Sequence, residues 1–147
     1  MKNLLIFSLL LCSITAKSQV DSAHKKQLVF QYVEQMPEPQ YDIYAFLSRN
    51  IVYPLAAQKS GVQSVVYIKF IVQANGEIDG VAVQRVVKYQ YDQLSKSDIQ
   101  IQVAKLGDGI EEEALRVVKL FAPWKPGKQN GKTVDVFYTL PITFKLR

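Results

Sequence analysis

Apolar and polar residues alternate most regularly at the end of the chain. From Val134 to Leu146 every second residue is apolar, which predicts a long strand with one buried face. Pro141 lies within this strand and has no N–H for a sheet ladder, so the strand is expected at a sheet edge. An edge strand of this kind can accept another strand.

A helical pattern comes directly before that strand. Apolar residues recur at helical spacing from Ile110 to Phe121, and Pro123 is expected to end the helix. Asp108 stands three residues before Glu111, the spacing of a capping box at a helix start. A Pro/Trp/Gly turn, from Pro123 to Gly127, then separates the predicted helix from the strand.

The middle of the chain contributes two helical segments and a hairpin. Asp42 can cap a helix that ends near Asn50, and Pro54 can open a second short one that stops at Gly61. Two strands, over residues 65–72 and 78–86, flank Asn75-Gly76, a strong hairpin signal, and Gly80 marks a bulge or weak point. These elements predict an α+β domain with helices on one face of a small antiparallel sheet.

Residues 87–107 fit this plan least well. They are polar and rich in Tyr, Gln, Ser and Lys, yet Ile99, Ile101 and Val103 alternate with glutamines. We interpret this segment as an insertion that contains a short extra strand.

The start of the chain has the pattern of an export signal. Lys2 precedes an apolar run from Leu4 to Ile14 that is too short to span a bilayer, and cleavage is expected after Ser18. Residues 19–40 then form a short linker, and residues 41–147 the domain. Cys12 lies inside the signal behind Leu11, where a lipoprotein would have a small residue, so lipidation is not expected and the mature chain has no cysteine.

Charge and composition exclude several classes of function. The whole chain has a formal net charge of +5, which becomes +3 when Lys2 and Lys17 leave with the signal. The charges are scattered and export removes nucleic acid as a partner. His24 stands alone in the linker, and Glu111, Glu112 and Glu113 are explained as carboxylates that complement a helix dipole. The sequence therefore predicts no enzyme, no metal site, no cofactor and no small-molecule substrate.

The ordered set of these motifs resembles the C-terminal domain of TonB-family energy transducers across residues 43–146. The motifs are Asn50-Ile51-Val52-Tyr53-Pro54, Gly61, the strand Val65–Val72, Asn75-Gly76-Glu77-Ile78, Glu113-Ala114-Leu115-Arg116-Val117-Val118, Trp124-Lys125-Pro126-Gly127-Lys128 and Leu140-Pro141-Ile142-Thr143-Phe144. The resemblance implies a three-stranded antiparallel sheet packed against two helices, located in the periplasm. It also implies binding of the short "TonB box" of TonB-dependent outer-membrane transporters.

In that family the box adds as a strand beside the C-terminal strand, here Thr133–Leu146, and also contacts the segment before Tyr-Pro. The resemblance therefore implies a partner-binding set on these two segments and the intervening turn: Asn50, Ile51, Val52, Trp124, Val134, Val136, Phe137 and Tyr138. Three of these have structural alternatives. Trp124 can be a core anchor, Asn50 can cap its helix C-terminally, and Phe137 can pack under residues 87–107.

Two departures from the family shape the expected function, and one is the insertion at residues 87–107, where the family usually has a short Gly-rich turn. Transport-driving members have a membrane helix and a long Pro-rich spacer, whereas here a signal and 22 residues precede the domain. The expected function is therefore capture of a transporter or envelope-protein strand by β-augmentation, accessory to energy-dependent transport. The alternative is a structural envelope module whose free edge pairs with a second copy of itself.

Overall fold

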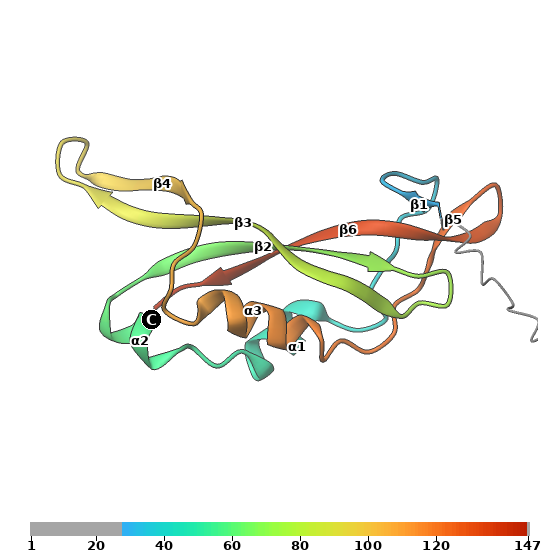
Figure 1. The fold of residues 1–147 in the computed structure, drawn as a ribbon, viewed down its shortest axis with the longest axis horizontal. Coiled ribbons are helices and arrows are strands. Elements are labelled where there is room, and N and C mark those ends of the chain that lie inside the picture. The colour runs from blue at the N-terminus through green and yellow to red at the C-terminus, as the bar shows by residue number, and fades with distance from the viewer. Residues whose placement is uncertain (1–27, 147) are drawn as a thin grey trace, which may run out of the picture.

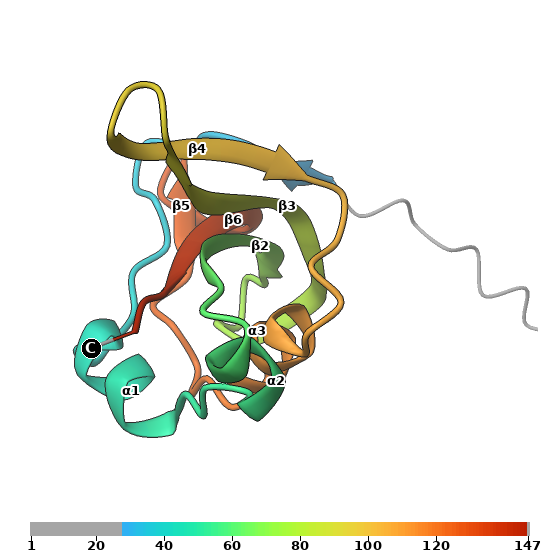
Figure 2. The same cartoon turned by 90° about the vertical axis from the view of Figure 1, so that its left-hand side faces the viewer.

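The structure is a computed structural model that describes residues 28–146; the predicted signal and the linker as far as residue 27 lie outside the described residues. Nine elements follow one another along the chain: β1 (Val29–Phe30), α1 (Ile43–Asn50), α2 (Leu55–Lys59), β2 (Gln63–Val72), β3 (Ile78–Asp92), β4 (Ser97–Val103), α3 (Ile110–Val118), β5 (Gly127–Gln129) and β6 (Lys132–Phe144). The helices gather on one face of a twisted sheet (Figures 1 and 2).

The sheet has the strand order β1-β6-β2-β3-β4, and β5 pairs with β6 beside this path. β2 runs antiparallel to both β3 and β6, while the short β1 runs parallel to β6. The α+β class is confirmed, but the described residues form six strands where three were expected. The extra strands are β1 and β5, which with two and three residues are too short for an alternation to appear, and β4, the short strand expected within residues 87–107.

Residues 87–107 contribute one of the three additional strands. The first of them continue β3 as far as Asp92, and the extra strand expected around Ile99 is β4, paired antiparallel with β3. The two strands form a long hairpin that extends beyond the rest of the sheet (Figure 1). The hairpin thus prolongs the edge of the sheet, while Leu106, which follows it, packs against the core and donates a backbone hydrogen bond to Glu111 of α3.

The helices begin and end for local reasons that the structure makes visible. The Asp42 carboxylate accepts hydrogen bonds from the Tyr44 and Ala45 backbone N–H groups, each at 3.0 Å, and so caps α1 as predicted. The prediction that Asp108 caps α3 is wrong. Gly109 holds the N-cap position at φ 87°, a left-handed conformation that glycine adopts without strain.

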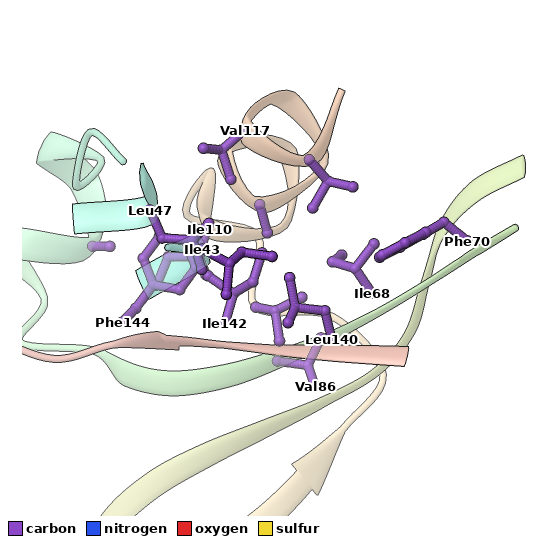
Figure 3. Packing of buried hydrophobic residues seen from close by; sticks show 14 of the residues in the cluster. Ile43, Leu47, Ile68, Phe70, Val86, Ile110, Val117, Leu140, Ile142 and Phe144 are labelled. Carbon is purple, nitrogen blue, oxygen red and sulfur yellow. The ribbon is translucent and has the colours of Figure 1, made fainter. Parts of the chain in front are cut away.

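The core lies between the helices and the inner face of the sheet. Alternate residues of β6, Leu140, Ile142 and Phe144, point toward α1 and α3 (Figure 3). Ile43 and Leu47 of α1 meet them from one side, and Ile110 and Val117 of α3 from the other (Figure 3). The alternation of β6 and the apolar stripe of α3 therefore predicted the buried faces correctly.

Residues 29–38, where a linker was predicted, lie along β5 and β6 instead. Gln35 exchanges two backbone hydrogen bonds with Lys128, and Glu38 exchanges two with Lys125. The Glu38 carboxylate also lies 3.5 Å from the Lys125 ammonium. We call residues 29–38 the strap. The described part of the predicted linker is thus packed on the domain, because its backbone groups find partners on the turn before β6.

Candidate functional site

The outer edge of β6 has a covered half and an open half. β5 pairs with residues Lys132–Val134, and β1 pairs with Asp135 and Val136. From Phe137 to Phe144, β2 is the only strand among the described residues that pairs with β6. One side of this eight-residue stretch therefore has no strand partner in the described part of the chain.

Pro141 lies in the open half, opposite Tyr67 of β2. Proline has no N–H, so in a sheet it is placed where its nitrogen faces away from the neighbouring strand. Because backbone donors alternate along a strand, the Thr139 and Thr143 N–H groups then face the same open side. The expectation that Pro141 lies at a sheet edge agrees with its pairing to β2 on one side only among the described residues. The open half offers main-chain donors and acceptors to an incoming strand.

Helix α1 and the residues after it lie beside this open edge. Ile51 and Tyr53 line a shallow cavity of about 250 Å³ together with Thr143 and Phe144 of β6. Tyr44 of α1 is 74% exposed. The pKa of the Tyr138 phenol is raised first by burial and then by the Tyr44 side chain. An incoming strand would thus meet apolar and aromatic side chains on its helix side.

The segment Asn50–Val52 is fastened to α3 by two charged side chains. The Glu113 carboxylate accepts a hydrogen bond from the Val52 N–H, and the Arg116 guanidinium donates one to the Asn50 carbonyl, both at 2.7 Å. Glu113 and Arg116 are themselves paired at 2.7 Å. The Arg116 hydrogen bond lowers the pKa of Glu113, and the Val52 N–H lowers it further. Glu113 and Arg116 are therefore both charged when they bind residues 50–52.

Trp124 anchors the core. It is 1% exposed, which confirms the anchor interpretation over that of an exposed contact. Its ring packs edge-on against Tyr138 at 4.9 Å and Phe70 at 5.5 Å, and stacks on Phe121 at 6.0 Å. Its influence on the open edge runs through Tyr138, which it holds in place from the helix side.

Phe137 points to the opposite face of the sheet from Tyr138, since neighbouring residues of a strand alternate. The Lys69 ammonium lies 3.9 Å from the centre of the Phe137 ring, a cation–π contact. Beside them a cavity of about 300 Å³ is lined by the strap residues Tyr32 and Met36 and by Thr139. Phe137 thus packs near the strap and Lys69.

The predicted partner-binding residues form two groups. Ile51 lines the shallow cavity with Thr143 and Phe144 at the end of the open edge, Asn50 and Val52 flank Ile51 in the chain, and Phe137 and Tyr138 lie on the open edge itself. Val134 faces β5, and Val136 is fully buried between Val72 of β2 and Phe30 of β1. Asn50 also donates a side-chain hydrogen bond to Phe46, so it stabilises the end of α1 as well.

Sequence reasoning missed three residues of the site. Tyr44 was overlooked because the helical stripe of α1 drew attention to its buried face, whereas Tyr44 lies on the exposed one. Glu113 was assigned to helix electrostatics and Arg116 was given no role of its own, and their contacts with residues 50–52 join positions more than sixty residues apart. The signal that could have found this pair is the i, i+3 spacing of opposite charges, which places them on one helix face.

Residues 28–146 contain no group of three or more His, Cys, Asp or Glu side chains that could hold a metal ion. None of the helices in this part of the chain is long and apolar enough to cross a membrane.

Comparison with known protein families identifies the C-terminal part of the site. Residues 95–146 match the family described as Gram-negative bacterial TonB protein C-terminal. The matched residues contain β4, α3, β5 and β6, and therefore the whole open edge. The resemblance to this family is confirmed by the match. No curated protein matches the chain.

Proposed function

We propose that this protein is an envelope protein that binds an extended peptide strand of an outer-membrane transporter or another envelope protein, and the match of residues 95–146 to the TonB C-terminal family supports this proposal. The strand adds to β6 along Phe137–Phe144. The protein works in the periplasm as an accessory to energy-dependent transport, and binding requires no cofactor, metal or catalytic step. The observation that carries the proposal is the open half of the β6 edge, which no described strand other than β2 pairs with.

Strand addition obtains affinity from the main chain and selectivity from alternate side chains. On β6 the Thr139 and Thr143 N–H groups supply outward donors, and Pro141 leaves a gap between them. The peptide side chains on one face would meet Tyr44 and Ile51, and those on the other would meet Phe137 under the Lys69 ammonium. The site therefore favours a peptide with apolar residues toward the helices and a polar or acidic residue near Lys69.

The segment Asn50–Val52 completes one wall of the site. Val52 is exposed although it is apolar, and its N–H is held by Glu113. A rigid wall next to a strand edge reduces the conformational entropy lost when a peptide binds. Glu113 and Arg116 therefore support binding by position and need not touch the peptide.

The test is site-specific photo-crosslinking in growing cells, followed by mass spectrometry of the adducts. A photoreactive residue at Tyr44 is expected to capture the N-terminal segment of an outer-membrane transporter. The matched exposed control carries the photoreactive residue at Leu94, at the far end of the β3–β4 hairpin, and is expected not to capture the transporter segment. Identical adducts from both positions, or a Tyr44 adduct with a second copy of this chain alone, would contradict the proposal.

A further inference from the structure

A second open strand edge lies at the other end of the sheet. β4 is the last strand in the order, and within residues 28–146 no strand pairs with its outer side. Most of β4 is exposed, including Ile99 at 38%. This edge is separated from β6 by β2 and β3, so a contact here is independent of the proposed peptide site.

The end of the β3–β4 hairpin is a two-stranded ribbon. β2 begins at Gln63, which pairs with Tyr89, so β3 pairs only with β4 from Gln90 to Asp92. The ribbon projects beyond the rest of the sheet (Figure 1), and Leu94 in its turn is 95% exposed. A two-stranded ribbon is marginally stable in water, and a third strand adds the pairing that it lacks.

The outer edge of β4 has none of the features that prevent an exposed strand from pairing with another strand. Proteins protect open edges with proline, lysine, bulges or covering segments. Between Ser97 and Val103 there is no proline or basic residue, and the pairing with β3 has no register shift. β6, by contrast, has Pro141 in its open half. The β4 edge is therefore open to strand pairing along its full length.

The sequence of β4 is complementary to itself. Ile99, Ile101 and Val103 share one face, and Asp98, Gln100 and Gln102 share the other. Two copies of β4 can pair antiparallel in several registers. Only the register that places Gln100 opposite Gln100 pairs all seven residues of both strands.

This register brings favourable side chains together. Ile99 lies opposite Ile101 of the second copy, an apolar cross-strand pair. Asp98, the only charged residue of β4, lies opposite Gln102 of the second copy and not opposite another carboxylate. No like charges meet within the strands.

We propose that two copies of this protein associate through their β4 edges, with a two-fold axis at Gln100. The hairpins then form a four-stranded antiparallel ribbon that joins the two sheets into one. Both β6 edges remain outside this contact, so each dimer presents two peptide sites. Two sites on one particle increase the apparent affinity for partners that are clustered in a membrane.

The test is a charge exchange on the axis, measured by sedimentation velocity of the purified protein over a range of concentrations. The unmodified protein is expected to shift from one-copy to two-copy mass as its concentration rises. Gln100→Lys or Gln100→Asp places like charges opposite each other, so each variant alone should need about tenfold more protein to associate. An equimolar mixture of the two variants should restore association, because each lysine then meets an aspartate.

Gln102→Lys is the matched control, since the same substitution on the same face now meets Asp98 of the second copy. It should associate at least as well as the unmodified protein. One-copy mass at every concentration would overturn the proposal. A dimer that Gln100→Lys leaves unchanged would also overturn the proposal. A dimer that is lost in the Thr139→Pro variant of β6 would overturn it as well. Circular dichroism of each variant verifies that the fold is retained.

Discussion

The Glu113 carboxylate of α3 accepts a hydrogen bond of 2.7 Å from the Val52 backbone N–H, and so joins two segments that lie sixty-one positions apart in the chain. The same carboxylate pairs with Arg116, which holds the carbonyl of Asn50. One helix turn thus determines where the wall beside the open β6 edge stands.

Removal of the Glu113 side chain should loosen this wall. Glu113→Ala leaves the Val52 N–H and the Arg116 guanidinium without their acceptor, so we expect a loss of about 1–3 kcal/mol in the free energy of unfolding. Peptide affinity should fall with it. Glu112→Ala is the control, because Glu112 is exposed and pairs with Lys105 at the surface, a contact of about 0–1 kcal/mol. Denaturant unfolding measures both, and equal losses would contradict the assigned role of Glu113.

The same contact makes the wall sensitive to acid. The pKa of Glu113 is lowered in the folded protein, first by Arg116 and then by Val52, from an unfolded value of about 4.3. The stabilisation is therefore fully present above that value and is lost as pH falls through the lowered folded pKa. We expect a steeper loss of stability below about pH 4.3 in the unmodified protein than in Glu113→Gln. Parallel pH profiles for the two proteins would contradict this.

Trp124 should be the largest single contributor to the core. Trp124→Ala removes a buried indole that contacts Phe70, Phe121 and Tyr138, and the expected cost is about 3–5 kcal/mol. Trp124→Phe keeps much of the contact area and should cost less. Near-ultraviolet circular dichroism and thermal unfolding distinguish the two. A value below about 1 kcal/mol for Trp124→Ala would show that the pocket collapses around the loss.

Removal of one main-chain donor tests the direction of strand addition. Thr139→Pro deletes an N–H that faces the open side, so peptide binding should weaken while pairing with β2 is retained, as Pro141 already demonstrates two residues away. Thr139→Ala is the control, since it loses only the side-chain hydrogen bond to Gln84 and keeps the N–H. Isothermal titration with the transporter peptide measures the difference. Equal affinity in both variants would exclude augmentation at this position.

Val136 is not suited to a proline substitution that tests strand addition. Its two neighbours, Val72 and Phe30, belong to strands that flank β6 on both sides, and its side chain is fully buried. A proline there would disturb the fold itself.

The parts of the fold that follow a burial pattern were predictable from the sequence. β6 and α3 each bury one continuous face, so their apolar residues recur at strand and helix spacing. The hairpin at Asn75-Gly76 was predictable because its turn requires residues that tolerate positive φ, and Gly76 has φ 88°.

The remaining elements are determined by contacts between distant residues. β1 has only two residues, too few for any alternation to appear, and its place depends on Asp135 and Val136 of β6. Most of β4 is exposed, so its short alternation of isoleucines and glutamines predicted a strand but not its pairing with a β3 prolonged to Asp92. For the site, the sequence predicted residues 50–52 and the whole strand from Thr133 to Leu146, of which β1 and β5 cover the first part. The contact between Glu113 and Val52 depends on the tertiary fold and could not be predicted.

The strap has a consequence for the order in which the molecule assembles. Its residues meet partners very far along the chain, as with Glu34 and Gln129, ninety-five positions apart, so these contacts cannot form before β5 and β6 are in place. The contacts it makes are few and mostly exposed. The strap should therefore dock last during folding and open first in native-state hydrogen exchange, well before the β2–β6 ladder. Each opening would lengthen the bare stretch of β6, from Phe137 back to Asp135, without unfolding the core.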